Sequence, residues 1–160
     1  MAVEPTRARI EIRAFSTEDR EFLARIASRV RPAETASPRE PAAMDRFFHA
    51  LEQGRLLTEP GAESFVATID AEPCGLVSIH PDTVYFTGHS RAYVDLLVVA
   101  EEAQCQGVGR SLMTHAERWA REHLYREVVL DVFASNDSAM RFYERCGYRP
   151  DHIRMAKPVA

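Results

Sequence analysis

Gln104-Cys105-Gln106-Gly107-Val108-Gly109-Arg110-Ser111 is a glycine-containing segment with very different sequence on its two sides. The run before it, Val94-Asp95-Leu96-Leu97-Val98-Val99, is almost continuously apolar, as a strand buried on both faces would be. The residues after it are apolar at helical spacing, which predicts an amphipathic helix that begins near Gly109. A strand, a short loop and a helix in this order direct unpaired backbone N–H groups and a helix dipole at an anion. The sequence therefore predicts that a phosphorylated ligand binds here.

Two common phosphate loops do not fit this segment. A P-loop needs a lysine directly after its second glycine, but the only lysine of the chain is Lys157. A dinucleotide-binding fingerprint needs a third glycine, and Leu112 occupies that position. The loop therefore predicts an anion site of another kind.

Composition and charge limit the class of protein. The chain has 160 residues, of which 46% are hydrophobic and 28% charged, and its formal net charge is −4. These values predict one soluble globular domain over residues 1–160, and the negative charge argues against a nucleic-acid partner. Three cysteines without metal-ligand or redox spacing favour a reducing compartment and give no support to a metal site. Because no signal-peptide pattern or membrane-length apolar run is present, we expect a cytoplasmic protein without a membrane partner.

Hydrophobic periodicity predicts a mixed α/β domain with an antiparallel front half and a β-α-β-α rear half. Short helices are expected after Ser16 and over residues 42–53, separated by a proline-containing loop at 31–41. The rear helices begin near Gly109 and at Asn136. The expected strands are residues 10–15, 64–69, 75–80, 93–99, 128–133 and 153–156.

Two carboxylates interrupt the apolar strands of the rear half. Asp95 and Asp131 are each either desolvated, which would raise the pKa toward the range of a general base, or bonded to backbone N–H groups at a strand end. Strict alternation would place Asp95 on the same face as Leu97 and Val99. The sequence does not decide which acid faces a pocket.

Tyr143 lies on the apolar side of the last predicted helix. It is either a core tyrosine or a proton donor to a leaving thiolate, since a phenol has a pKa of about 10. Cys105 lacks a histidine placed to activate it, so a nucleophilic role is disfavoured. The histidines have no metal-ligand spacing, and no metal is expected.

Two motifs of the rear half together resemble the GCN5-related N-acetyltransferases. The first is Leu97-Val98-Val99 followed by Gln104-x-x-Gly107-x-Gly109, which resembles the acyl-CoA-binding motif of that family. The second is Asn136-x-x-Ala139-x-x-Phe142-Tyr143-Glu144-x-x-Gly147-Tyr148. An Ile12-Arg13-x-x-x-x-x-Asp19 start and the strand with Gly75 are similar but less specific.

The resemblance implies a fold and a role for each motif. The fold is a single domain with a twisted, mostly antiparallel sheet of about six or seven strands, a splayed parallel pair and about four helices. The loop N–H groups of residues 105–111 would hold the pyrophosphate of coenzyme A, and the strand at 97–99 would pair with the pantetheine. A backbone N–H of Val98 or Val99 would polarise the thioester carbonyl. Asn136 would contact the pantetheine and Tyr143 would be the general acid.

Asp131 stands where the ribosomal-protein branch of the family carries a catalytic glutamate, one methylene longer. A base that acts through water is therefore as well supported as a base in direct contact. The predicted catalytic residues are Tyr143, Asp131 and Asp95. The predicted coenzyme-binding residues are Leu97, Val98, Val99, Gln104, Cys105, Gln106, Gly107, Val108, Gly109, Arg110, Ser111, Asn136, Ala139, Phe142 and Tyr143.

The implied reaction is acetyl-CoA-dependent acetylation of a primary amine by direct attack on the thioester. Two alternatives remain: a non-catalytic acyl-CoA-binding or regulatory domain, and an enzyme that acetylates proteins or peptides instead of small amines. Residues 30–54 and 81–91 are expected to set the choice of acceptor. The acceptor itself and the existence of a homodimer are left open by the sequence.

Overall fold

A computed structural model describes residues 9–30, 41–55, 59–153, 155 and 157, with the backbone only for 41–45. The chain divides into two compact units. The first, here called the sheet unit, comprises Met1–Asp19 and Thr58–Val129. The second, here called the helical unit, comprises Arg20–Leu57 and Leu130–Ala160.

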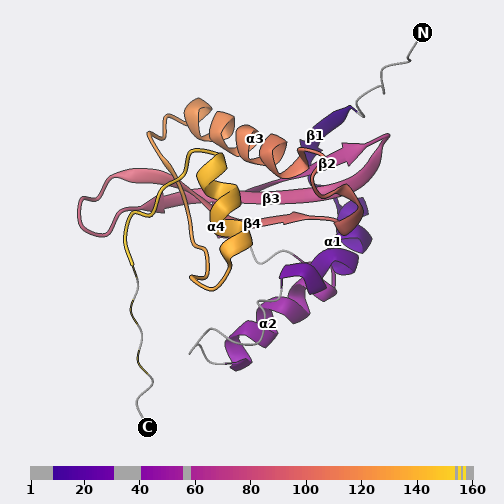
Figure 1. Cartoon of the computed structure of the whole chain (residues 1–160), viewed down its shortest axis with the longest axis horizontal. Helices are drawn as coiled ribbons and strands as arrows, with labels where there is room; N and C mark the ends of the chain where they lie inside the picture. The colour runs from indigo at the N-terminus through magenta and orange to yellow at the C-terminus, as the bar shows by residue number, and fades with distance from the viewer. Residues whose placement is uncertain (1–8, 31–40, 56–58, 154, 156, 158–160) are drawn as a thin grey trace. The chain divides into compact units, whose positions relative to one another are not determined.

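One sheet of five strands, in the order β1-β2-β3-β4-β5, organises the described residues (Figure 1). β1 to β4 pair in antiparallel fashion, whereas β4 and β5 form a parallel pair. The mixed α/β class, the mostly antiparallel sheet, the parallel pair and the four α-helices expected from the sequence are therefore confirmed. The strands are β1 Ile10–Ala14, β2 Glu63–Ile69, β3 Glu72–Thr83, β4 Ser90–Val99 and β5 Val128–Leu130.

The expected strand count is too high, because the described part of the chain has five strands and not six or seven. β5 ends at Leu130, whereas the sequence predicts a strand to residue 133. The strand predicted at 153–156 is also wrong at its described residues, since Ile153 and Met155 lie outside any strand. Both side chains are more than 80% exposed, so no sheet buries them. Arg154 and Ala156 lie outside the described residues.

The long helix α3, Val108–Glu122, packs on strands β1 to β4 within the sheet unit. Its apolar stripe, which includes the fully buried Leu112, covers the sheet as the periodicity predicts. Gly75 on β3 lies where the helix and the sheet approach most closely. A Cβ added at Gly75 would come within 2.9 Å of both Val108 Cγ1 and Leu112 Cδ1. The first turn of α3 is thus held directly on the sheet.

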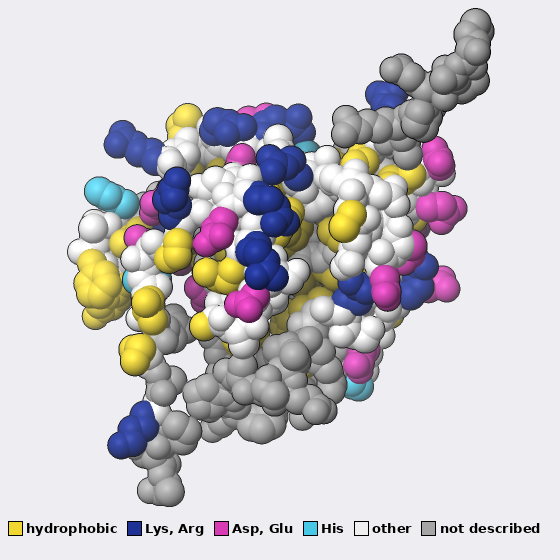
Figure 2. Space-filling model, viewed as in Figure 1, with side chains coloured by type: hydrophobic (Ala, Val, Ile, Leu, Met, Phe, Trp, Pro, Cys, Tyr) yellow, Lys and Arg dark blue, Asp and Glu magenta, His cyan; other side chains and the backbone are white. Residues whose placement is uncertain are grey.

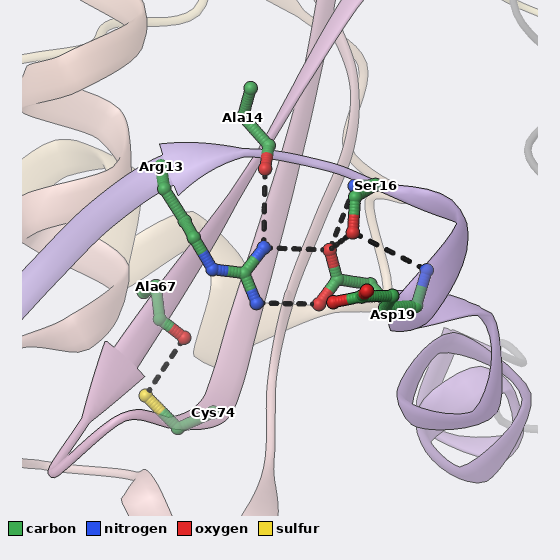
Figure 3. Close-up of polar contacts among 7 residues, drawn as sticks. Arg13, Ala14, Ser16, Asp19, Ala67 and Cys74 are labelled. Carbon is green, nitrogen blue, oxygen red and sulfur yellow. Dashed lines mark hydrogen bonds and ion pairs between the residues drawn. The ribbon is translucent and has the colours of Figure 1, made fainter.

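An ion pair between the half-exposed Arg13 and a buried carboxylate fixes the chain after β1 (Figure 3). Arg13 donates from Nη1 and Nη2 to the two carboxylate oxygens of Asp19, at 2.7 Å each, and the Ser16 N–H donates to Oδ2 at 2.8 Å. Asp19 is only 2% exposed. The hydrogen bonds from Arg13 hold its pKa below the usual range. Arg13 and Asp19, which form part of the N-terminal sequence similarity, therefore have a structural role.

Cys74 on β3 is also a structural residue. Its thiol is buried and donates to the Ala67 carbonyl oxygen of β2 at 3.3 Å (Figure 3). Burial raises the pKa of this thiol, which disfavours the reactive thiolate.

The helical unit is built from α1 Arg20–Ile26, α2 Pro41–Glu52 and α4 Asp137–Arg145. α1 follows a short 3-10 turn, as expected after Ser16, and α2 begins one residue earlier than predicted. α1 packs against α2, and a Cβ at Gly54 would come within 2.5 Å of the Arg20 carbonyl oxygen. The predicted loop at 31–41 lies outside the described residues except for Pro41. No helix in the described residues is long and apolar enough to cross a membrane.

Candidate active site

The glycine loop lies between the end of β4 and the start of α3. β4 ends at Val99, a 3-10 turn spans Glu101–Ala103, and α3 begins at Val108. Two residues of the loop adopt left-handed backbone conformations, Gly107 with φ of 89° and Cys105 with φ of 61°. The loop makes this turn in few residues because Gly107 tolerates a conformation that is costly for other side chains.

The N-terminus of α3 presents backbone donors without a side-chain cap. Its N-cap is Gly107, and the first helical hydrogen bond runs from Ser111 N to Gly107 O at 3.0 Å. The N–H groups of Val108 and Gly109 therefore have no acceptor within the helix. Gln104 to Gly107 are exposed, so an anion can reach this end of the helix. The geometry has the features of the anion site predicted from the sequence.

The loop is anchored from both sides. Val108 is 1% exposed and packs at the Gly75 contact, which fixes the first turn of α3. On the exposed side, Gln106 Nε2 donates to the Glu102 carbonyl oxygen at 2.8 Å. A rigid loop keeps its N–H groups directed at one point in space, which lowers the entropic cost of binding.

At the end of β4 that leads to this loop, the backbone groups of successive residues point alternately toward β3 and away from it. Ala100 N donates to Cys74 O at 2.8 Å, so in an antiparallel ladder Val98 also points its backbone groups toward β3. The backbone groups of Leu97 and Val99 then point away from β3. Of the two amides expected to polarise a thioester, that of Val99 points away from β3.

A β-bulge interrupts β4 at Asp95. Ser78 pairs with Leu96 and the next residue of β3, Ile79, pairs with Val94, so Asp95 is the extra residue of β4. Ser78 and Ile79 are neighbours on β3, so their side chains face opposite sides of the sheet. Their partners Leu96 and Val94 face the same sides as they do, so Val94 and Leu96 also lie on opposite faces. Strict alternation along β4 would put Val94 and Leu96 on one face, so it does not hold there. The sequence-based placement of Asp95 on the face of Leu97 relied on that alternation and is not supported by the register.

Asp95 is half-buried, and its Oδ1 has no hydrogen-bond partner among the described residues. Burial raises the pKa of this carboxyl above its usual value. The nearby Ser78 hydroxyl and the charge of His80 oppose the shift, and Glu59 adds to it. The sequence allowed Asp95 to be either desolvated or bonded to backbone N–H groups at a strand end, and desolvation describes it.

Asp131 differs from its expected environment. It follows the last residue of β5 and is exposed, so it does not interrupt a buried strand. The sequence Val-Val-Leu-Asp-Val-Phe contains no glycine or proline, and the strand stops at Leu130, directly before the aspartate. Of the two interpretations that the sequence allowed for Asp131, desolvation does not describe it, and it lies directly after a strand end.

The second motif forms α4 of the helical unit, with the predicted cap. Asn136 Oδ1 accepts a hydrogen bond from the Ala139 N–H at 3.1 Å. Ala139, Phe142 and Tyr143 are half-buried. Burial, with a smaller electrostatic effect of Cys146, raises the pKa of Tyr143 to about 12. The phenol thus stays protonated at neutral pH and can donate a proton.

Comparison with known proteins agrees with this combination of loop, sheet and helix. The model of the family described as "Acetyltransferase (GNAT) family" matches residues 21–148, which is most of the chain. The chain belongs to this family. The match includes both motifs and residues of both compact units.

Individual GNAT relatives are distant. An aminoalkylphosphonate N-acetyltransferase of Salmonella typhimurium strain LT2 is 27% identical over 103 residues, which cover 64% of this chain and 67% of the relative. A structure titled as an acetyl transferase from Pyrococcus furiosus is 25% identical with a TM-score of 0.74, covering 94% of this chain and 100% of the other. The structure of AAC(6')-Iy with the bisubstrate analog CoA-S-monomethyl-acetylneamine is 15% identical with a TM-score of 0.68, covering 96% and 100%. At that identity, the last likeness shows the fold alone.

The predicted site residues of this GNAT chain fall into two groups. Asp95, residues 97–99 and the glycine loop belong to the sheet unit, whereas Asp131, Asn136 and Tyr143 belong to the helical unit. Within the sheet unit, a 3-10 turn and the glycine loop join the end of β4 to the uncapped N-terminus of α3. Figure 2 shows both basic and acidic side chains on the face in view. The described residues contain no cluster of histidine, cysteine and acidic side chains fit for a metal ion.

Sequence reasoning missed two features near Asp95. The bulge leaves no sign in the sequence, because buried Val94 and Leu96 continue the apolar pattern on either side of it. Ser78, which is 2% exposed and lies beside Asp95, was also not singled out. A serine in a strand has no distinctive pattern, and only the pairing of β3 with β4 reveals its neighbour.

Proposed function

We propose that this GNAT protein is an acetyl-CoA-dependent N-acetyltransferase that acts on a primary amine. The observation that carries the proposal is the uncapped N-terminus of α3, which follows an exposed loop after the strand that holds a desolvated acid, Asp95. The first feature suits a pyrophosphate, and the second suits a general base. The presence of both the uncapped helix N-terminus and the desolvated acid favours an enzyme over a non-catalytic acyl-CoA-binding domain.

Coenzyme A would lie along the end of β4 and the glycine loop. The N–H groups of residues 105–111 would hold its pyrophosphate, and the outward backbone groups of Leu97 and Val99 would pair with the pantetheine. The Val99 N–H is our choice for the donor to the thioester carbonyl, since the ladder directs Val98 toward β3. Asn136, Ala139 and Phe142 enter this proposal through the family motif, and the capping bond of Asn136 leaves its NH₂ group to donate.

The chemistry would proceed by direct attack. Asp95 takes a proton from the acceptor ammonium, and the neutral amine attacks the acetyl carbonyl carbon. As the tetrahedral intermediate collapses, the C–S bond breaks and Tyr143, which enters the proposal through the family motif, gives its proton to the leaving thiolate. The surplus proton on the attacking nitrogen leaves at the same stage and restores the Tyr143 phenol, which yields a neutral amide and a free thiol. Asp95 is preferred to Asp131 because burial moves its pKa toward neutral pH, whereas Asp131 is exposed. Most of the rate would come from positioning the two substrates.

The acceptor would be a small primary amine. The name of the Salmonella relative, aminoalkylphosphonate N-acetyltransferase, supports this class over a peptide acceptor. The test is to incubate the protein with acetyl-CoA and a panel of aminoalkylphosphonates, polyamines, aminoglycosides, amino acids and peptides while free thiol is followed. Thiol release with one class of small amine is the expected result. Binding of coenzyme A without turnover on any amine would instead support a binding domain.

Asp95→Asn and Asp131→Asn form a matched pair for the same assay. Loss of the base at Asp95 should lower kcat/KM by about a hundredfold or more. Asp131→Asn should stay within about twofold of the unmodified protein, since exposed positions outside a site contribute little. The reverse order of effects would transfer the role of base to Asp131.

A further inference from the structure

Three buried polar atoms that have no hydrogen-bond partner among the described residues lie in one row across the sheet. They are Ser64 Oγ on β2, Ser78 Oγ on β3 and Asp95 Oδ1 on β4. Among the described residues the only other such side-chain atom is Trp119 Nε1. Buried polar atoms are nearly always bonded, so a row of three requires an explanation.

The strand register makes the members of the row neighbours. Ser64 is the direct partner of Ser78 in the β2–β3 ladder. Ser78 is in turn the partner of Leu96, beside the bulged Asp95. Paired residues share a face and have Cβ atoms about 5 Å apart, which allows two hydroxyls to meet by rotation about χ1. The three side chains therefore follow one another across three adjacent strands.

Donors and acceptors in this row match in one direction. A serine hydroxyl has one proton to give and can accept two, whereas an ionised carboxylate only accepts. Ser64 can therefore donate to Ser78, and Ser78 can donate to Asp95. In the reverse direction Asp95 would have to donate to Ser78, but the carboxylate has no proton to donate while it serves as a base. Such hydrogen bonds are often long in a free enzyme and shorten when the substrate complex forms.

We propose that Ser78 is a positioning residue that holds the Asp95 carboxylate by a hydrogen bond, and that Ser64 acts on Asp95 through Ser78. The inference rests on the proposed function in taking Asp95 as the base. One carboxylate oxygen receives the Ser78 hydroxyl, which leaves the other for the acceptor ammonium. The bulge brings Asp95 beside Ser78, where a regular strand would place it on the opposite face.

The row has a consequence for pH dependence. The Ser78 hydroxyl and His80 on β3 lower the pKa of Asp95, and Glu59, just before β2, raises it. Removal of the Ser78 hydroxyl should therefore raise the pKa further. A base works only when it is unprotonated, so the acid limb of the kcat/KM profile should move to higher pH. On the acid side, Ser78→Ala should lose about tenfold in kcat/KM, as expected for a hydrogen bond to a charged group.

The experiment is a double-mutant cycle with Ser64→Ala, Ser78→Ala and both changes together. The readouts are the pH profile of kcat/KM and the titration of the isotope-labelled Asp95 carboxyl by NMR. Ser64→Ala should move both in the same direction as Ser78→Ala, by less, and should have no effect once Ser78 is alanine. Ser28→Ala, which removes an exposed hydroxyl from the 3-10 turn Ala27–Val30, is the control and should change neither readout.

Each outcome bears on the row or on the proposed function separately. Unchanged titration of Asp95 in Ser78→Ala would overturn the proposal, and so would an equal Ser64→Ala effect with and without Ser78. The NMR titration needs no substrate, so it judges the row even if no amine is turned over, a result that would count against the proposed function alone. If Ser78→Ala fails to fold, Ser64→Ala decides, and no change in the Asp95 titration contradicts the proposal.

Discussion

Replacement of Gly75 by alanine should both destabilise the protein and weaken coenzyme A binding. The new Cβ would lie 2.9 Å from Val108 Cγ1 and Leu112 Cδ1, and 3.2 Å from the Val98 carbonyl oxygen. To reach 3.4 Å, where ordinary contacts begin, the two side chains must each move by at least 0.5 Å. Val108 and Leu112 are 1% and 0% exposed, so neither has free space nearby. The expected response is a shift of the first turn of α3 away from the sheet.

Overpacking of this kind costs about 1–3 kcal/mol of unfolding free energy. For a protein of this size, that corresponds to a fall in Tm of about 2–12 °C. The same shift moves the N–H groups of Val108 and Gly109, so coenzyme A affinity should fall by about tenfold, as for the loss of one or two well-placed hydrogen bonds. Thermal denaturation and isothermal titration with coenzyme A measure the two effects.

Gly88→Ala is the control, because a Cβ there meets nothing within 4 Å. Its φ of 67° makes alanine cost about 1 kcal/mol through backbone strain alone, so Tm should fall slightly while affinity stays the same. If Gly75→Ala keeps the Tm and the affinity of the unmodified protein, the close contact between α3 and β3 does not position the loop, and the reasoning is refuted.

Three further changes probe other parts of the molecule. Gly109→Trp places a large side chain on the first turn of α3 and should lower coenzyme A affinity by about tenfold or more with an unchanged circular dichroism spectrum; full affinity would contradict the anion site. Tyr143→Phe should lower kcat by about ten- to a hundredfold without abolishing transfer, and because the pKa of Tyr143 is about 12 the unmodified protein should show no alkaline loss from this group below about pH 10. Arg13→Met should cost about 2–3 kcal/mol in denaturant unfolding, since it leaves buried Asp19 unpaired. The pKa of Asp19 is lowered in the folded state, so the ion pair contributes fully to the unfolding free energy above the ordinary aspartate pKa, and this contribution is lost as pH falls through the lowered value. If Arg13→Met lowers the unfolding free energy as much at strongly acid pH as at neutral pH, the result would count against the pairing.

Local patterns predicted most elements, because each carries its own physical signal. The alternation of residues 10–15, the long apolar stripe of α3 and the Asn136 cap of α4 all appear where the sequence indicates them. The prediction of an anion at the glycine loop rests on backbone groups and on the order of strand and helix. The end of β4, the loop and the start of α3 are adjacent in the chain, so their arrangement needed no long-range information.

Long-range pairing decided the features that the sequence did not reveal. The bulge at Asp95 is a property of how β4 aligns with β3, and the apolar residues Val94 and Leu96 conceal it. β5 stops at Leu130 although Val132 and Phe133 would suit a longer strand, so the environment of Asp131 could not be read from its neighbours. The row from Ser64 to Asp95 likewise exists only through the register of three strands.

The most direct test of coenzyme A binding at the glycine loop is an amide NMR titration of the loop. Coenzyme A should shift the backbone N–H resonances of Val108 and Gly109 strongly, because its pyrophosphate would accept hydrogen bonds from them. Pantetheine, which lacks the pyrophosphate, should leave these two resonances in place while it perturbs Leu97 and Val99. Saturating coenzyme A that leaves Val108 and Gly109 unshifted would contradict the phosphate site, and with it the proposed acetyl transfer.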